Sequence, residues 1–427
     1  MKSERLAKAF RFLVIAGGIL AVVSASEKMI TSSLATGDME SYLHAARSIL
    51  AGQDIYATPS RPSAEGGLYY LYPPLLAVLF IPFALLPVPV AIVLWSVLNL
   101  LLLAWIVKAF YEAMAGTSLG ALKFDERWTI LFFALLPPSR FILHHFFYGQ
   151  ANIFMMALAV LGLKQLKAGN SWRGSTAMGL SIASKVMTYP FALLFLLKKN
   201  VQAVTGIVAG AVIGLLLPVL VLGFNANWNY LGFWFKNIAL SPEVNGSKVP
   251  LYVNVSVQAQ LYRWFGDAAG FTFRGQPHYM TIFQLPDSVL HAGEILLTVV
   301  MLAVIVLYWY RFKNAAELVS HWGAAALTLG LISVFTPFAQ KHYLVLLVPA
   351  FLFLVHVWYR IELHDKWFHQ LVIASSVLLI FTNEAICGEY LGAVFSGMGA
   401  TACGAILACA AIFRAASCLN SKQGLAI

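Results

Sequence analysis

The stretch PVAIVLWSVLNLLLLAWIVKA, residues 89–109, is apolar almost throughout and carries one charged residue, Lys108, near its end. A helix of about 20 apolar residues crosses the hydrocarbon layer of a bilayer, which is about 30 Å thick and offers the backbone no hydrogen-bonding partner. This stretch therefore predicts a membrane-spanning helix.

The rest of the chain has the same character. Of its 427 residues, 60% are hydrophobic and 11% are charged, and the mean hydropathy is +0.79. Soluble domains carry about 25% charged residues. The sequence therefore predicts an all-α polytopic membrane protein with a single membrane domain, residues 1–427. We expect membrane-embedded segments at 10–26, 72–87, 89–109, 128–147, 150–166, 174–187, 188–197, 203–222, 287–311, 321–336, 343–360, 370–387 and 391–413.

Charge and cysteine content exclude several classes of protein. The net charge is +10, an excess typical of cytoplasmic loops in membrane proteins, so we expect contacts with membrane lipids and no nucleic-acid partner. The four cysteines lie in or just after the last two apolar segments, and their spacing fits neither a disulfide framework nor a zinc site. Metalloprotease, hydrolase and nucleotide-binding motifs are absent from the sequence, so we expect no metal and no cofactor.

Basic residues predict the orientation of the chain. Four of them precede the apolar stretch 12–25, as in a signal peptide, but no convincing small-residue cleavage site follows. We therefore expect an uncleaved first span with a cytoplasmic N-terminus. Arg311, Arg360 and Arg414 follow later spans, which places the C-terminus in the cytoplasm as well. Residues 27–71 and 223–286 are then two external loops.

The first half of the chain leaves two topologies open. An odd number of crossings must separate the external residues 27–71 from Lys198 and Lys199, which we expect inside, yet six embedded segments lie between them. In the first topology the proline-containing segment 72–87 is a re-entrant or surface-lying hairpin. In the second, 174–197 is one span and 72–87 crosses. The first topology places more cations inside and is therefore favoured.

The favoured topology brings four polar features to the external side of the membrane. They are Asp38, the turn HHFFYGQAN at residues 144–152, Lys185 and His342. Because the orientation rests on loop cations and uses none of their chemistry, this convergence independently supports a site on the external face.

Asp38 lies just after Gly37, near the start of the amphipathic stretch TGDMESYLHAARSIL, residues 36–50. On a helix, apolar residues fall on one side, at 39, 43, 46 and 50, and polar residues on the other, at 40, 44, 47 and 48. Such a helix is suited to the membrane interface. Asp38 is explained either as the N-cap of this helix or as a carboxylate held at the membrane surface to act as a general base. The two interpretations are compatible.

Further polar residues interrupt apolar sequence. Lys185 is an ionisable group inside an apolar run, and the free energy needed to bury its charge there indicates a function. Either it contacts a phosphate or its side chain extends to the membrane interface. Arg140 and His342 are also candidates for binding a phosphate, Arg140 through two parallel hydrogen bonds. The candidates for binding substrate are Tyr72, His145, Gln150 and Asn152, although interfacial anchoring and packing explain such side chains equally.

Six stretches, taken in order, resemble a known family. They are AGQDIY at 51–56, YLYPPLLAVLFIPFALLP at 70–87, FYGQANIFMMAL at 147–158, SKVMTYPFALLFLLKK at 184–199, NVSVQAQLYRWF at 254–265 and TPFAQKHYLVLLVP at 336–349. Together with the early Asp38 they resemble glycosyltransferase family 87, whose members use polyprenol-phosphate sugars, among them polyprenol-phosphate-mannose-dependent mannosyltransferases. The resemblance runs from about residue 10 to about residue 355.

The resemblance implies a fold and a reaction. The fold would be a multi-spanning C-type (GT-C) bundle of about 12 transmembrane helices with external interfacial helices, in an inner or plasma membrane. A hydroxyl of a lipid-linked or glycolipid acceptor would attack the anomeric carbon of the donor, with inversion and with Asp38 as the base. Lys185 would contact the phosphate, and Asn254 would bind substrate. His342 matches a histidine that is often paired in the family, whereas Lys341 precedes it here.

Two other classes stay open. A transporter or flippase of a lipid-linked sugar would also need many spans and buried polar residues, but such proteins often contain repeated halves, and this sequence shows none. A non-catalytic assembly subunit would tolerate loss of Asp38.

Overall fold

The computed structural model describes residues 2–31, 37–59, 69–240 and 254–424. By its internal contacts, the chain divides into two compact units. Unit 1 comprises Met1–Val14, Phe110–Ile142 and Pro242–Ile427, and unit 2 comprises Ile15–Ala109 and Leu143–Ser241. Three helices continue from one unit into the other: α1 (Lys2–Thr31), α5 (Val88–Ala115) and α7 (Ser139–Phe147).

Unit 2 is helical wherever it has regular structure in its described part. Its further elements are α2 (Asp38–Leu50), α3 (Pro74–Leu79), α4 (Ile81–Ala84), α8 (Asn152–Lys167), α9 (Ser171–Ser184), α10 (Pro190–Leu197), α11 (Val201–Leu216), α12 (Val219–Leu222), α13 (Phe224–Trp234) and the π-helical turn η2 (Phe235–Ala239).

The predicted embedded segment 72–87 is broken into two short helices, α3 and α4. At 1.5 Å per residue, residues 74–84 reach about 17 Å, well short of the about 30 Å of a bilayer core. Pro82 lies at the start of α4 and cannot donate a backbone hydrogen bond. A single straight crossing helix is therefore not formed here, and the favoured topology stays a prediction.

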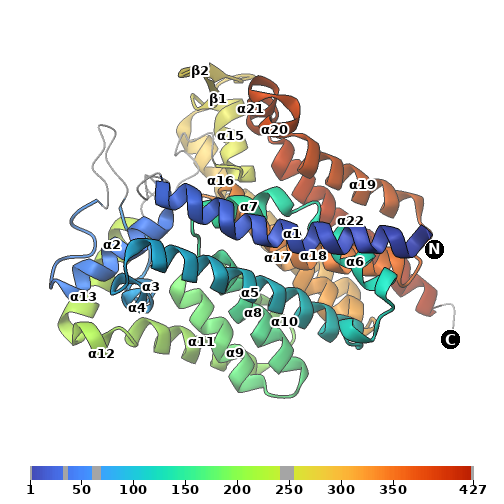
Figure 1. Ribbon diagram of the computed structural model, residues 1–427, viewed down its shortest axis with the longest axis horizontal. Helices are drawn as coiled ribbons and strands as arrows, with labels where there is room; N and C mark the ends of the chain where they lie inside the picture. Colours follow the sequence, from blue (N-terminus) through green and yellow to red (C-terminus); the bar gives the residue numbers. More distant parts are fainter. Residues whose placement is uncertain (1, 32–36, 60–68, 241–253, 425–427) are drawn as a thin grey trace. The chain divides into compact units, whose positions relative to one another are not determined.

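Small residues bring α9 and α11 close together; both lie in the green part of Figure 1. Gly206, Gly210 and Gly214 follow one another at intervals of four residues on α11. A Cβ atom on Gly210 would collide with the backbone of Thr176 on α9, and one on Gly214 would lie 2.5 Å from the Cβ of Ala183. Small residues at this spacing let helix backbones approach closely in membranes. The packing fixes the end of α9.

Unit 1 combines helices with one small hairpin. Its further elements are η1 (Leu119–Ala121), α6 (Phe124–Leu135), α15 (Val257–Phe265), β1 (Ala269–Phe273), β2 (Gln276–Tyr279), α16 (Asp287–Phe312), η3 (Leu318–Gly323), α17 (Ala324–Phe335), η4 (Lys341–Leu347), α18 (Val348–Tyr359), α19 (Lys366–Phe381), α20 (Glu384–Cys387), α21 (Glu389–Gly397) and α22 (Ala400–Gly424). Every residue of α17 is buried, so this helix forms the centre of the unit's core.

The hairpin lies within the predicted second external loop, residues 223–286. Its strands pair antiparallel from Ala269↔Tyr279 to Phe273↔Gln276. Arg274 and Gly275 form the turn, with φ of 50° and 78°. Two consecutive positive φ values are typical of the tight turns that match the twist of a hairpin. In the described residues this loop therefore contains strands as well as helices.

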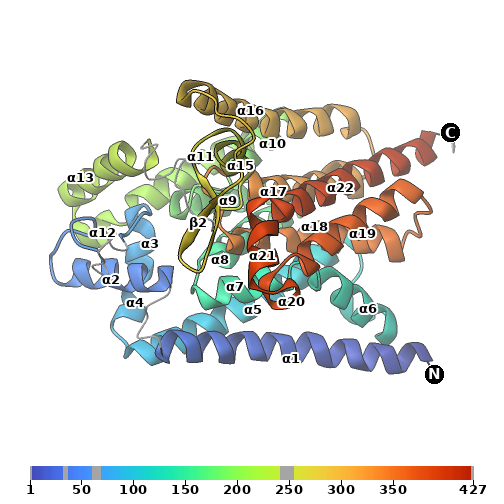
Figure 2. The ribbon, with the colours of Figure 1, turned by 90° about the horizontal axis from the view of Figure 1, so that it is seen from above.

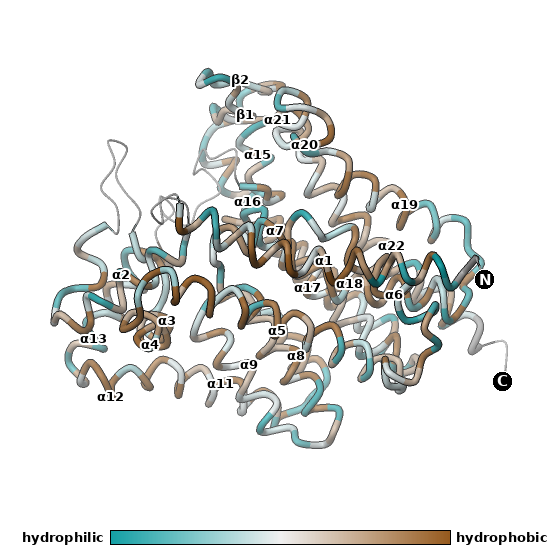
Figure 3. The backbone as a smooth tube through the Cα atoms, viewed as in Figure 1, coloured by the Kyte–Doolittle hydropathy of each residue, from teal (hydrophilic) through white to brown (hydrophobic). Residues whose placement is uncertain are grey.

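Seven helices in the described residues are long and apolar enough to cross a membrane. They are Glu4–Thr31, Val88–Ala115, Val201–Leu222, Asp287–Phe312, Leu318–Phe335, Lys341–Tyr359 and Ala400–Ser421. The bent pair Phe124–Leu135 and Ser139–Phe147, with 64° between its halves, makes an eighth if it is one span. The all-α polytopic class is thus confirmed, as the brown stretch of α5 in Figure 3 illustrates, but the expected count of about twelve is not.

The shortfall has a physical reason. Hydropathy marks a residue as apolar whether lipid or protein covers it, so buried short helices resemble spans. Helix α8 has 16 residues and α9 has 14, which makes them about 24 and 21 Å long. Both are too short to cross alone. The apolar segments 150–166 and 174–187 are therefore two packed short helices.

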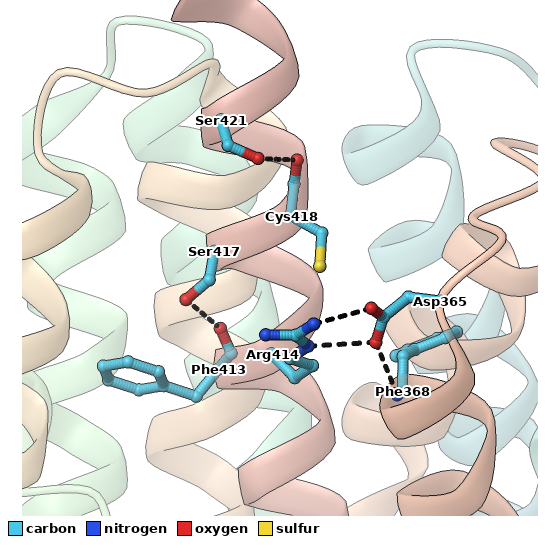
Figure 4. Close-up of polar contacts among 7 residues, drawn as sticks. All are labelled: Asp365, Phe368, Phe413, Arg414, Ser417, Cys418 and Ser421. Carbon is cyan, nitrogen blue, oxygen red and sulfur yellow. Dashed lines mark hydrogen bonds and ion pairs between the residues drawn. The ribbon is translucent and has the colours of Figure 1, made fainter.

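Helices α19 and α22 pack antiparallel and are joined at one end by an ion pair; they lie side by side in Figure 2. Arg414 donates from Nε to Asp365 Oδ1 at 2.9 Å and from Nη2 to Oδ2 at 2.6 Å (Figure 4). Asp365 also caps α19 by accepting from the backbone N–H of Phe368 at 2.8 Å. The hydrogen bonds from Arg414 lower the pKa of Asp365 to about 2.

The ion pair between Asp365 and Arg414 generates a stability prediction. Asp365→Asn keeps a capping oxygen but loses the charge, so we expect it to cost about 1 kcal/mol and about 2 °C of Tm in detergent. Because the folded-state pKa is depressed, the contribution is complete above the ordinary value of 3.8 and is lost as the pH falls towards about 2. Asp267→Asn, at an exposed position, is the control. Equal Tm values for the two variants at pH 7 would contradict the prediction.

Candidate functional site

The first turn of α2 docks against the turn between α7 and α8 in unit 2. The backbone N–H of Met39 donates to Tyr148 O at 3.3 Å. A Cβ atom on Gly37 would lie 2.5 Å from Tyr148 O, and one on Gly149 would lie 2.6 Å from the Cβ of Met39. Gly149 also has a φ of +57°, a conformation that favours glycine. Two glycines therefore allow the helix start and the turn to touch.

This contact directs the Asp38 carboxylate across unit 2. Its Oδ1 accepts a hydrogen bond from the hydroxyl of Tyr72 at 2.9 Å, and its Oδ2 accepts one from Nε2 of Gln150. Asp38 is the first residue of α2, and the residue at the N-cap position is Gly37, which makes no side-chain cap. The N-cap interpretation is therefore wrong, because the carboxylate bonds to distant side chains.

Lys185 approaches the same amide from the other side. It follows the last residue of α9 and is 4% exposed. Its Nζ donates to Gln150 Oε1 at 3.0 Å and to Asn152 Oδ1 at 2.7 Å, and it lies 4.9 Å from the centre of the Tyr72 ring. A buried ammonium held by two amides does not snorkel to the interface. Gln150 thus lies between the carboxylate and the ammonium.

The turn that carries Gln150 is itself held by α5. The indole N–H of Trp95 donates to Gly149 O at 2.8 Å. One turn further along, Asn99 donates to Trp95 O at 2.9 Å, and its Oδ1 lies 3.2 Å from Nε2 of His145. His145, predicted to bind substrate, is 1% exposed. Its described contacts support the turn.

Aromatic side chains surround Tyr72. Its ring centre lies 5.2 Å from that of Tyr42 and 5.7 Å from that of Tyr70, and its carbonyl accepts from the hydroxyl of Tyr56 at 2.8 Å. Tyr42 is fully buried and donates to Gln150 Oε1 at 3.3 Å. These residues fix the ring that touches both Asp38 and Lys185.

Helix α2 presents a broader buried face than its pattern predicted. Ser48, expected on the polar side, is 3% exposed, whereas Leu50, expected on the apolar side, is 50% exposed. Because α2 packs against α3 and α4, its inner face is defined by protein and includes small polar residues. Its predicted location at the membrane interface stays a prediction.

The electrostatics of Asp38 suit proton transfer. Burial raises the pKa of its carboxyl above the ordinary value of 3.8, while the positive charge of Lys185 and the hydrogen bond from Tyr72 act in the opposite direction. A carboxylate with a raised pKa is a stronger base near neutral pH. Perturbed acids of this kind gather at functional sites.

Three predicted site residues belong to unit 1. Arg140 donates to Thr382 O at 3.1 Å and to Thr401 Oγ1 at 3.0 Å. Asn254 donates to Pro337 O at 3.0 Å and accepts from the N–H of Ser256 at 3.0 Å. His342 is 1% exposed. Their predicted roles in binding phosphate and substrate stay predictions.

The sequence reasoning missed several residues that shape the group around Asp38. Tyr42 and Trp95 lie in apolar runs, where an aromatic side chain carries no special pattern. Asn99 was detectable in principle, since an amide within the spanning stretch 89–109 requires a partner. Among the described residues, no group of three or more His, Cys, Asp or Glu side chains is arranged to hold a metal.

The fold and this group of residues define a multi-spanning membrane protein with a carboxylate–amide–lysine site. The sequence model of glycosyltransferase family 87 matches residues 70–337, which is more than half of the chain. The chain therefore belongs to glycosyltransferase family 87. Asp38 precedes the matched region and His342 follows it. No solved structure matches the chain, so the C-type fold implied by the resemblance stays a prediction.

Two relatives carry the name polyprenol-phosphate-mannose-dependent alpha-(1-2)-phosphatidylinositol mannoside mannosyltransferase. The one from Mycobacterium tuberculosis is 31% identical over 202 residues, which cover 45% of this chain and 47% of the relative. The one from Mycolicibacterium smegmatis is 25% identical over 229 residues, which cover 51% of this chain and 50% of the relative. The chain thus aligns with about half the length of each relative.

The close contact at Gly149 generates a second stability prediction. We expect Gly149→Ala to destabilise the protein by about 2 kcal/mol or more, because alanine is strained at positive φ and its Cβ would displace Met39. The matched control is Gly52→Ala, whose φ is +65° but whose Cβ would meet nothing within 4 Å. Thermal unfolding of both variants measures the difference. Equal losses would mean that the contact with α2 contributes nothing.

Proposed function

We propose that this chain is an integral membrane glycosyltransferase that moves a sugar from a polyprenyl-phosphate donor to a lipid-linked or glycolipid acceptor. The observation that carries the proposal is the pairing of Asp38 with Lys185 through Gln150, in a chain that belongs to family 87. Asp38 and Lys185 lie 147 residues apart in the sequence, yet one amide contacts both of them. An acid and a cation fixed in this way can stabilise the charges that develop during the reaction.

The proposed reaction is a single displacement. The acceptor hydroxyl oxygen attacks the anomeric carbon, the bond from that carbon to the phosphate oxygen breaks, and Asp38 takes the hydroxyl proton. The products are an inverted glycoside and polyprenyl phosphate. Negative charge grows on the leaving phosphate, and a buried ammonium such as Lys185 stabilises it more strongly than it would in water.

The remaining residues have supporting roles in this proposal. Tyr72 and Gln150 orient the Asp38 carboxylate, and Asn152 orients Lys185. If hydroxyl groups of the substrate replaced these contacts, the side chains of Tyr72, Gln150 and Asn152 would bind the sugar. Arg140 and His342 are proposed to contact phosphate.

The donor and the compartment rest on the relatives. Both relatives are named for mannose and for phosphatidylinositol mannosides, so we propose polyprenyl-phosphate mannose as the first donor to test. We place the reaction on the external face of an inner or plasma membrane, with both termini in the cytoplasm.

Replacement of the base generates a prediction on activity. We expect Asp38→Asn to lower transfer of labelled mannose to extracted lipids by about 100-fold to 10,000-fold, since the proton acceptor is lost. Asp54→Asn is the matched control, because its side-chain oxygen can still accept from the N–H of Tyr56. The assay uses purified protein in liposomes, and Tm values check that both variants fold.

Two results would contradict the proposal. Transfer that survives in Asp38→Asn would leave this carboxylate a structural residue. Label that crosses the bilayer without joining a new lipid would make the chain a transporter or flippase.

The hydrogen bond from Tyr72 generates a prediction on pH dependence. The rate should rise with pH as Asp38 loses its proton, and burial places this rise above the ordinary carboxyl pKa of 3.8. The Tyr72 hydroxyl stabilises the charged form, so Tyr72→Phe should move the rise to higher pH. Tyr42→Phe, which removes a hydroxyl bonded to Gln150 instead, should move it less. An unchanged pH profile in Tyr72→Phe would mean that the hydroxyl does not tune the base.

A further inference from the structure

An extended segment, residues 71–73, precedes α3 and carries Tyr72. Pro73 has φ −58° and ψ 156°, which is polyproline II geometry. Tyr72 and Pro73 each precede a proline, and such residues favour extended backbone. A polyproline II segment makes no hydrogen bonds within itself, whereas backbone carbonyls removed from water need donors. The carbonyls of Leu71, Tyr72 and Pro73 therefore depend on other groups.

Aromatic side chains supply a donor to each of these three carbonyls. The pairs are Trp234 Nε1 with Leu71 O at 3.2 Å, Tyr56 Oη with Tyr72 O at 2.8 Å, and Tyr70 Oη with Pro73 O at 2.7 Å. Tyr56 and Tyr70 are 6% and 2% exposed. Burial raises the pKa of both hydroxyls above the ordinary value of 10.0, so both stay protonated and remain donors.

Helix α13, which packs against α3, brings Trp234 to this segment. Asn227, Tyr230 and Trp234 lie on one face of the helix, at intervals of three and four residues. Asn227 Nδ2 donates to Leu215 O in α11 at 3.0 Å. The hydroxyl of Tyr230 donates to Gln53 O at 3.4 Å. The helix is therefore anchored along this face, which fixes the position of the Trp234 indole N–H.

The segment held in this way orients the candidate base. The Tyr72 hydroxyl donates to Asp38 Oδ1 at 2.9 Å. In the part of the chain that the structure describes, Lys185 and Tyr72 are the charged or titratable side chains that act on this carboxyl. An O–H···O hydrogen bond needs about 2.5 to 3.0 Å between its oxygens, so a shift of the segment by about an ångström would weaken the bond.

We propose that Trp234 and Tyr56 are positioning residues for the Asp38 carboxylate. By holding the backbone of residues 71–73, they direct the Tyr72 hydroxyl to Asp38 Oδ1. Their hydrogen bonds end on backbone carbonyls, so their effect on Asp38 passes through Tyr72. The consequence for sugar transfer rests on the proposed function, whereas the effect on the ionisation of Asp38 rests on these contacts alone.

An indole near a membrane surface can instead anchor the chain at the lipid headgroups. On α13 the aromatic residues suited to that role are Phe224 and Trp228, whose side chains are 61% and 63% exposed. The N–H of Trp234, in contrast, is bonded within the protein. The two roles are therefore divided between different faces of the same helix, and Trp228 provides a control for Trp234.

The test follows the ionisation of Asp38 without turnover. Fluorotyrosine replaces Tyr72 in the full chain, which is reconstituted in nanodiscs, and the fluorine resonance is followed against pH. The resonance should change as the bonded carboxyl loses its proton, and Asp38→Asn should remove this step. The test variants, which keep an aromatic ring and lose the donor, are Trp234→Phe and Tyr56→Phe. The matched controls, at exposed positions, are Trp228→Phe and Tyr69→Phe.

We expect each test variant to raise the midpoint of the Asp38 step by about 0.4 to 1 pH unit, the range that one hydrogen bond supports. The midpoint rises because a Tyr72 hydroxyl held less firmly stabilises the carboxylate less. The two control variants should leave the midpoint unchanged. Tyr56→Phe loses only one oxygen atom and decides the case in which Trp234→Phe does not fold. Unchanged midpoints in the folded test variants overturn the proposal, and so does the absence of a step that Asp38→Asn removes.

Transfer of sugar is scored separately on chains that carry the natural Tyr72. Trp234→Phe should move the pH profile of the rate upward and should add little to the effect of Tyr72→Phe, since one hydroxyl carries both effects. Full additivity would indicate a general loss of structure and would overturn the positioning role. A midpoint that moves in a chain without transfer from any donor rejects the proposed function and keeps the positioning residues. Transfer with unmoved midpoints does the reverse.

Discussion

One amide side chain holds opposite charges in a fixed arrangement. Gln150 donates from its nitrogen to Asp38 and accepts at its oxygen from Lys185 and Tyr42. The nitrogen of an amide donates hydrogen bonds and its oxygen accepts them. If the Gln150 amide were turned over, its oxygen would face the Asp38 carboxylate and its nitrogen would face the Lys185 ammonium, and neither hydrogen bond could form. This arrangement therefore requires three segments to be close in space: the start of α2, the turn after α7 and the end of α9. Gly37 and Gly149 permit the first of these contacts, and the glycines of α11 fix α9.

Polar anchors also mark the two ends of the α19–α22 pair. Asp365 and Arg414 join the helices at one end, while Thr382 and Thr401 bind Arg140 at the other. Between these ends the helices are apolar, and α19 has 16 residues and is about 24 Å long, like α8, which is shorter than a bilayer core of about 30 Å.

Hydropathy and pattern predicted part of this structure. They identified Asp38, Tyr72, Gln150, Asn152 and Lys185, because polar groups in apolar surroundings are conspicuous. The expected count of about twelve spans is not confirmed in the described residues, since α8 and α9 are apolar but short. They also failed on the N-cap role of Asp38 and on the burial of Ser48 and Leu50, because local periodicity does not say whether protein or lipid covers a helix face.

The sequence by itself determined the all-α membrane class and membership of family 87. Both depend on properties that add up along the chain: apolar content over about 20 residues and the order of short motifs. Only the tertiary structure decided that Gln150 bridges Asp38 and Lys185, and that Asp365 pairs with Arg414. These contacts join residues from separate helices, and they form only where helix packing brings a donor within about 3 Å of its acceptor.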